Sequence, residues 1–234
     1  MPVSSHEVSI DNIFSPFFIK ALYHKGFYLT IFVIDLVYMK KKQLGFNLAL
    51  MGMIASGKET QTAILKKKYS LQSIETGVYT RNLLKEKSKD GEWARRTAGK
   101  GAPLPTVLMQ KFLTSQIDKK PKNKDLIFIG GPRLKPEAQL AKKILHLRGQ
   151  NIFVIYISLP DKEVYKRSIK RKEGNMKDIY KVFDTKELIK KRIKWHKDQV
   201  IKTINYFDGL GVLKKINGNQ SIDKAILSFQ KRVK

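Results

Sequence analysis

The hydrophobic pattern alternates between short, continuous apolar runs and longer amphipathic segments. A continuous apolar run is typical of a strand buried on both faces, whereas apolar positions three or four residues apart are typical of a helix. The predicted strands are 47–52, 69–75, 126–129, 152–157 and 212–216. The predicted helices are 60–68, 106–117, 136–148, 161–172, 187–207 and a last one from about residue 221.

Strands that alternate with helices predict an α/β fold in which helices flank a central, five-stranded parallel sheet. Ligands bind such sheets beyond the carboxyl ends of the strands. The segments 52–58, 76–81 and 130–133 each follow a predicted strand. We therefore expect all three at the same edge of the sheet.

Residues 1–44 differ from the rest of the chain. The segment 13–39 is rich in aromatic and aliphatic residues, but its longest clean run, 27–34, is interrupted by Asp35 and is too short to span a bilayer. It also lacks the basic start and the cleavage site of a signal peptide. We expect an extension outside the core, followed by a domain over 45–234. Weak contact of 13–39 with a membrane surface stays open.

The net charge of +27 has two interpretations: binding to a polyanion, or a general preference for lysine. Nine of the 47 basic residues are arginines, and the lysines are scattered, which favours the second. The absence of cysteine excludes disulfides and Cys-based zinc sites, and it fits a reducing compartment such as the cytoplasm.

The most informative motif lies between the first strand and the first helix and reads G-x-x-x-x-G-K. Glycines let the backbone wrap an anion, and the start of the helix offers free N–H groups to phosphate. The alternative is an ordinary glycine-containing turn with a solvated lysine. Glu59 stands where the general motif has Ser or Thr. The candidate phosphate-binding residues are Gly52, Ala55, Ser56, Gly57, Lys58, Glu59 and Thr60.

Arginines recur near the strand ends and near 173–183. Guanidinium groups bind phosphate through two parallel hydrogen bonds. Phosphoryl transfer requires two phosphate-bearing substrates held in line, with their charge neutralised. One arginine alone could be a solvated helix charge, but the set indicates a two-substrate site. Its members are Arg81, Arg133, Arg167, Arg171 and Arg192.

These motifs resemble, in order over about residues 46–230, those of the adenylate kinase and nucleoside monophosphate kinase family. The matching segments are the loop 52–61, Thr76-Gly77 with Arg81, the turn 101–105, Gly130-Gly-Pro-Arg133, Leu159-Pro-Asp161 and the loop 217–220. The resemblance implies a P-loop NTPase fold with two insertions. These are an acceptor-binding insertion over about 74–105 and a short, metal-free lid over about 172–183.

The resemblance also implies roles for single residues. The donor nucleotide would be bound by the phosphate loop, with Arg167 and Asn219 at the adenine and Arg171 at the phosphates. The acceptor would be bound by Thr76, Gly77, Arg81, Arg133 and Glu137, with Gln139 as a substitute if the helix register differs. The expected catalytic residues are Lys58, Arg133, Arg171 and Arg192. Asp184 and Arg192 would close the lid.

Several positions depart from the family pattern. Val78 and Ile129 replace two carboxylates that help to hold the waters around magnesium. Glu137 replaces a glutamine that reads the acceptor base, and a carboxylate accepts but does not donate. In the lid, Lys181 and Phe183 replace an arginine and an aspartate. Since magnesium is recruited largely by nucleotide phosphates and water, we predict no protein metal ligand.

The expected activity is transfer of the γ-phosphoryl group of Mg-ATP to a nucleoside monophosphate, with AMP as the expected acceptor. Two alternatives remain. One is a regulatory or interaction protein of the same fold that binds nucleotide but turns over weakly. The other is a basic, nucleic-acid-binding P-loop protein. A cytoplasmic monomer without a transmembrane span and without a specific nucleic-acid partner is expected.

Overall fold

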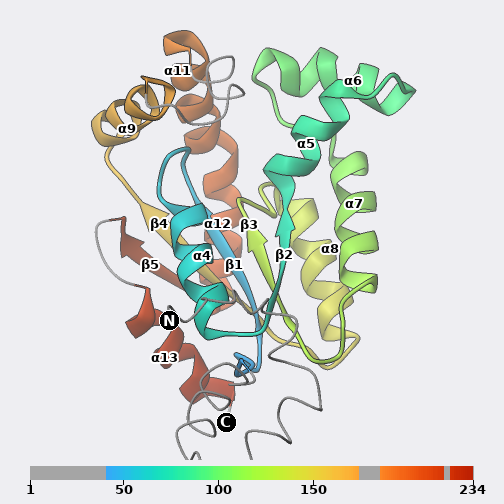
Figure 1. Cartoon of the computed structure of the whole chain (residues 1–234), viewed down its shortest axis with the longest axis vertical. Coiled ribbons are helices and arrows are strands. Elements are labelled where there is room, and N and C mark those ends of the chain that lie inside the picture. Colours follow the sequence, from blue (N-terminus) through green and yellow to red (C-terminus); the bar gives the residue numbers. More distant parts are fainter. Residues whose placement is uncertain (1–40, 174–184, 219–221, 234) are drawn as a thin grey trace, which may run out of the picture. The chain divides into compact units, whose positions relative to one another are not determined.

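The computed structural model describes residues 41–173, 185–218 and 222–233. In this part of the chain, parallel strands form a five-stranded sheet in the order β2-β3-β1-β4-β5 (Figure 1). The strands are β1 (Asn47–Gly52), β2 (Leu71–Glu75), β3 (Asp125–Ile129), β4 (Ile152–Ser158) and β5 (Leu213–Asn217). The predicted five-stranded parallel sheet is confirmed.

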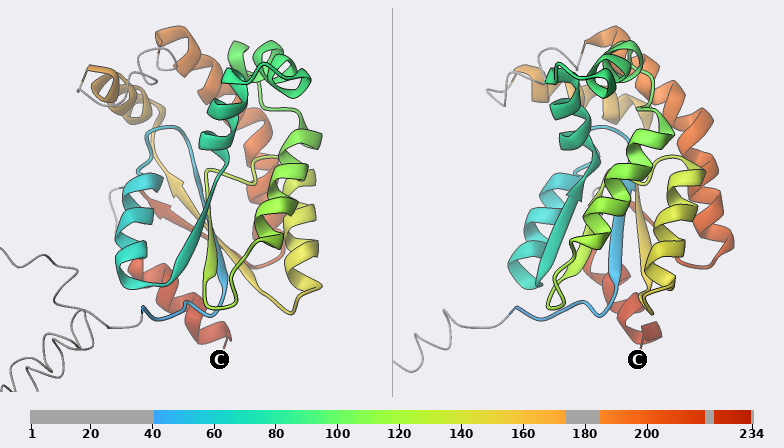
Figure 2. Two further views of the ribbon diagram at one scale, coloured as in Figure 1. Left: turned by 45° about the vertical axis from the view of Figure 1, so that its right-hand side comes forward. Right: turned by 90° about the vertical axis from the view of Figure 1, so that its right-hand side faces the viewer.

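Helices cover both faces of the sheet, with α7, α8 and α12 on one face and α4 and α13 on the other (Figure 2). The helices before the third strand are α4 (Lys58–Lys68), α5 (Thr76–Lys85), α6 (Lys89–Thr97), the 3₁₀ turn η1 (Ala98–Lys100) and α7 (Thr106–Asp118). Those after it are α8 (Lys135–His146), α9 (Asp161–Glu173), α11 (Lys186–Trp195), η2 (His196–Val200), α12 (Ile201–Gly209) and α13 (Asp223–Val233).

Strand β1 shows why its apolar run is continuous. Ala49 and Met51 pack in the core beneath α7, α8 and α12, whereas Leu48 and Leu50 pack in the core beneath α4 and α13. Successive side chains of a strand point to opposite faces, so a strand covered on both faces needs apolar residues at every position. This burial fixes β1 in the middle of the sheet, with the loop after Gly52 at its carboxyl edge.

The helix predicted over 187–207 is interrupted by a π-helical turn. It consists of α11, the π turn η2 and α12. A π turn holds one more residue than an α turn and therefore shifts which side chains face the sheet. At this point Trp195 and His196 lie on the side of the helix that faces the carboxyl edge of the sheet.

The domain begins before the predicted boundary at residue 45. Lys42 pairs with Tyr69 in an isolated bridge, and Leu44 and Phe46 are buried in the core beneath α4 and α13. An apolar side chain that packs in the core belongs to the domain, so the boundary at 45 is corrected. The segment 1–40 lies outside the described residues. Among the described helices, none is long and apolar enough to cross a membrane.

Candidate active site

The loop between β1 and α4 wraps tightly over the carboxyl edge of the sheet. Gly52 has a φ of 149°, and a Cβ atom there would lie 2.5 Å from the carbonyl oxygen of Ile157 and 2.8 Å from the Ser56 hydroxyl. Ala55 adopts a left-handed backbone with φ of 53°, and Gly57, also left-handed, precedes α4. Only glycine fits at position 52, because any side chain would push the loop away from β4.

The ammonium group of Lys58 lies inside this loop. Its Nζ donates to the carbonyl oxygens of Gly52 (3.0 Å) and Met53 (2.6 Å) and to the hydroxyl of Ser56 (3.0 Å). The pKa of Lys58 is lowered to about 8, mainly by burial and also by the charges of Arg133 and Arg171, while Glu59 partly offsets this. A phosphate placed here would neutralise the buried charge, so the loop favours an anion.

Two polar residues follow in the first turn of α4. Glu59 and Thr60 are both exposed. Desolvation raises the pKa of Glu59, but the positive charges of Lys58, Arg171 and Arg81 together with a backbone hydrogen bond hold it below its usual value. The carboxylate is therefore ionised and surrounded by cations at the start of the helix.

A second group of residues comes from the start of α5 and the loop after β3. The Thr76 hydroxyl donates to the Ile129 carbonyl oxygen (3.2 Å), and Arg133 Nε donates to the Gly130 carbonyl oxygen (2.6 Å). A Cβ atom at Gly131 would lie 2.6 Å from Thr76 Cγ2. The two segments are thus in direct contact, because β2 and β3 are neighbours and end at the same edge.

Glu137 lines the same space but is already engaged in its own helix. It is buried, and its Oε2 accepts from the backbone N–H groups of Arg133 (2.8 Å) and Leu134 (3.1 Å). Burial raises the pKa of Glu137, and these hydrogen bonds only partly offset that. Gln139 is exposed and is not among the residues that line the space. The observed register therefore favours Glu137 over Gln139.

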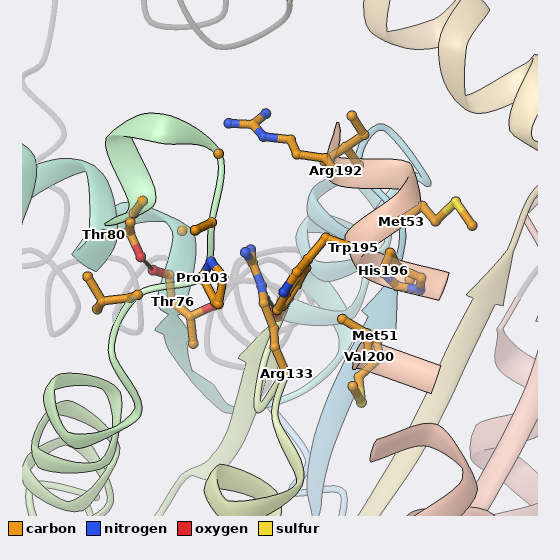
Figure 3. A pocket seen from close by; sticks show the side chains of 18 of the residues that line it. Met51, Met53, Thr76, Thr80, Pro103, Arg133, Arg192, Trp195, His196 and Val200 are labelled. Atoms are coloured by element: carbon orange, nitrogen blue, oxygen red, sulfur yellow. Dashed lines mark hydrogen bonds between the residues drawn. The ribbon is translucent and has the colours of Figure 1, made fainter. Parts of the chain in front are cut away.

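These segments enclose a cleft of about 180 Å³ at the carboxyl edge of the sheet. Arg133, Trp195 and Arg192 point into the space that Thr76 and Pro103 border from the other side (Figure 3). Residues from the turn 101–104 close it beside α5. Five cationic residues from different elements line the cleft, namely Lys58, Arg81, Arg133, Arg171 and Arg192. A cleft with this lining is suited to several phosphate groups at once.

Comparison with known proteins agrees with this geometry. Residues 50–212 match the family model described as adenylate kinase. The adenylate kinase of Azobacteroides pseudotrichonymphae is 30% identical over 194 residues, which cover 80% of this chain and 96% of the relative. That of Bacteroides thetaiotaomicron is 32% identical over 188 residues, 76% of this chain and 98% of the relative.

The chain belongs to the adenylate kinase family. It is an enzyme of the nucleoside monophosphate kinase class, as the resemblance implied.

Some residues with expected roles in this kinase do not line the cleft. Arg167 on α9 donates through Nε to Glu163 (2.6 Å) and is absent from the cleft lining. Asn219, Asp184 and most of the predicted lid, including Lys181 and Phe183, lie outside the described residues. The roles of Arg167 at the adenine and of the lid therefore stay predictions.

The carboxyl edge also lacks the two family carboxylates. Ile129 is buried in the core beneath α4, and Val78 lies in the first turn of α5 outside the cleft lining. Within 41–173, 185–218 and 222–233, no group of three or more His, Cys, Asp or Glu side chains could hold a metal ion. The expectation of no protein metal ligand is not tested by this observation.

Sequence reasoning missed Trp195, His196 and Tyr156 of this kinase. His196 is buried, its Nε2 lies 3.0 Å from the Tyr156 hydroxyl, and it lines the cleft together with Trp195. Burial, and then the charges of Lys58 and Arg133, lower the pKa of His196 to about 4. One signal was readable: His196 follows Arg192 by four residues, a spacing that places two side chains on one helix face.

Proposed function

We propose that this kinase transfers the γ-phosphoryl group of Mg-ATP to AMP, so that ATP and AMP give two ADP. The observation that carries this proposal is the convergence of Lys58 with four arginines on one cleft. Lys58 and the loop 52–60 bind the donor phosphates. Arg81 and Arg133, from the other side, bind the acceptor phosphate. Thr76, Gly77 and Glu137 lie beside the acceptor.

The residues act by positioning and by charge. Phosphoryl transfer needs little covalent help from the protein, so no general base is required. Lys58, Arg133, Arg171 and Arg192 neutralise the charge that spreads over the transferring group. Magnesium, when bound with ATP, supplies further neutralisation between the phosphates. The lid over 172–183 would exclude water, with Arg167 and Asn219 at the donor adenine.

A catalytically weak nucleotide-binding protein is the second candidate. Val78 and the buried Ile129 favour it, since neither offers an oxygen to the metal-bound waters. The two candidates differ in turnover but not in nucleotide binding.

A panel of AMP, CMP, UMP and GMP with ATP and magnesium tests the proposal. We expect transfer to AMP to be fastest in a coupled assay. Lys58→Met should lower kcat by about 100-fold or more, because it removes a preorganised charge at the transferring phosphates. If ATP binds but no monophosphate is phosphorylated, the second candidate holds.

We also propose that the chain is a cytoplasmic monomer whose residues 1–40 are not needed for transfer. That residues 1–40 are not needed is supported by the separate compact unit that begins at residue 41 and has its own core. Weak membrane contact by residues 13–39 would change location and leave the cleft unaffected.

A further inference from the structure

Most acidic side chains near the cleft are already engaged. Glu137 caps α8, Glu163 pairs with Arg167, and Asp161 at the start of α9 pairs with Lys197. Among the described residues, Glu59 is the carboxylate that adjoins the phosphate loop, directly after Lys58 in the first turn of α4. Glu59 does not itself line the cleft, but its carboxylate lies near enough to Lys58, Arg171 and Arg81, which do, to interact with their charges.

The position of Glu59 in the sequence motif indicates a role for this negative charge. In the general G-x-x-x-x-G-K-[ST] motif, the residue after the lysine is the Ser or Thr whose hydroxyl contacts magnesium. Glu59 occupies that position with a carboxylate, which is the kind of hard oxygen ligand that magnesium prefers. Its side chain is exposed, so it is accessible to an ion that arrives with the nucleotide.

The donor set fits magnesium in the form that nucleotide-binding proteins use. Magnesium keeps several waters and is usually held by one or two carboxylates together with substrate phosphates. The described residues offer no cage of three or more ligating side chains, but one carboxylate beside the loop meets the smaller requirement. Without a metal, the same carboxylate would repel the phosphates that Lys58 and Arg171 attract.

We propose that Glu59 takes over the task of the carboxylates missing at positions 78 and 129 and binds the magnesium ion of Mg-ATP, directly or through water. The inference rests on the proposed function, because magnesium reaches the cleft on the phosphates of ATP. The carboxylate then disfavours metal-free ATP and favours Mg-ATP, which makes nucleotide binding by this kinase unusually dependent on the metal.

Calorimetric titration of the full chain with ATP, once with Mg²⁺ and once with EDTA, tests the inference. In Glu59→Gln, metal-free ATP should bind more tightly, because the repulsion is gone. The factor by which Mg²⁺ tightens binding should fall about tenfold relative to the wild type. If Glu59 acts only as a charge paired with its cationic neighbours, the variant changes both affinities by the same factor, and the inference is overturned.

Glu75→Gln is the matched control. Glu75 is an exposed carboxylate at the end of β2, on the same edge of the sheet but separated by strand β3 from β1 and its phosphate loop. Removing the charge of Glu75 should leave unchanged the factor by which Mg²⁺ tightens ATP binding. An equal fall of this factor in both variants would show a general effect of charge and would overturn the inference. Binding is measured without acceptor, so a wild type that binds Mg-ATP without transferring phosphate would contradict only the proposed function.

Discussion

His196 illustrates how single residues of the cleft depend on their neighbours. Its ring is buried against Tyr156, and Lys58 and Arg133 add positive charge nearby. A protonated imidazole would add a buried positive charge close to Lys58 and Arg133, so the neutral ring is favoured. Because His196 is neutral, the positive charge that lines the cleft comes from the lysine and the arginines.

The pH dependence of stability should report this histidine. Its pKa is about 4 in the folded chain and 6.5 when exposed, so the unfolded state binds more protons between these values. The free energy of unfolding should therefore fall as the pH drops from about 6.5 to about 4, by up to about 3 kcal/mol from this residue. Urea unfolding of the wild type and His196→Gln across this range measures the difference, which should shrink as the pH falls.

His146→Gln is the control for that measurement, since His146 is exposed in the last turn of α8. The plot of unfolding free energy against pH for His146→Gln should run parallel to that of the wild type. A wild type and His196→Gln that keep the same separation at every pH would contradict the burial argument.

Glu137 shows what could be predicted for single residues. The motif around Arg133 indicated two candidates, Glu137 and Gln139, and two residues on a helix that are two apart lie on different faces. The observed start of α8 places Glu137 toward the cleft and leaves Gln139 exposed. The sequence could not decide this, because the first turn of a helix is fixed by its cap, here the Glu137 carboxylate itself.

At the scale of elements, the cleft depends on how closely its loops approach one another. The loop after β3 touches the first turn of α5 through Gly131 and Thr76, and α12 supports this loop from behind, where Thr203 donates to the Arg133 carbonyl oxygen (2.7 Å). These contacts fix the backbone of Arg133 relative to the start of α5. A small displacement of the loop would therefore move Arg133, which lines the cleft.

Gly131→Ala should separate these elements. A Cβ atom 2.6 Å from Thr76 Cγ2 cannot be accommodated without a shift, which typically costs about 1–3 kcal/mol in a packed site. We expect a lower Tm than in the wild type. We also expect the KM for the acceptor to rise more than the KM for ATP. Gly209→Ala at the end of α12, where a Cβ atom meets nothing within 4 Å, should have neither effect. Equal KM changes for both nucleotides would contradict this.

The strands and the larger helices could be predicted from the sequence. Their continuous apolar runs, as in β1 and β4, and the regular spacing of apolar residues in the helices are clear signals. The π turn η2 could not be predicted, since a hydrophobic period of 3.6 residues does not reveal one extra residue within a turn. The contacts made in and just after this turn join it to distant parts of the chain: His196 contacts Tyr156 of β4, and Thr203 of α12 donates to Arg133. The contact that His196 makes in the cleft is therefore tertiary, and the sequence shows only that His196 and Arg192 are four residues apart on one helix face.

At the scale of the whole molecule, the question is where the kinase domain begins. The described unit starts at residue 41, and Leu44 and Phe46, close to its start, are buried in its core. Phe46 packs edge to face against Phe153 and Phe229, with ring centroids 5.0 and 6.0 Å apart. The sequence placed this boundary at residue 45 because residues 1–44 differ in composition from the rest of the chain, whereas Leu44 packs in the core of the described unit.

Two truncations test this boundary. Removing residues 1–38 should leave kcat and Tm nearly unchanged, because Lys42, Leu44 and Phe46 keep their contacts. Removing residues 1–46 deletes two buried side chains and should cost several kcal/mol, since losing a buried phenylalanine alone costs about 3–5 kcal/mol. Thermal unfolding and the coupled assay measure both variants. If the shorter truncation already lowers Tm or kcat as much as the longer one, the first 38 residues belong to the domain, and the cleft depends on contacts that lie beyond its own core.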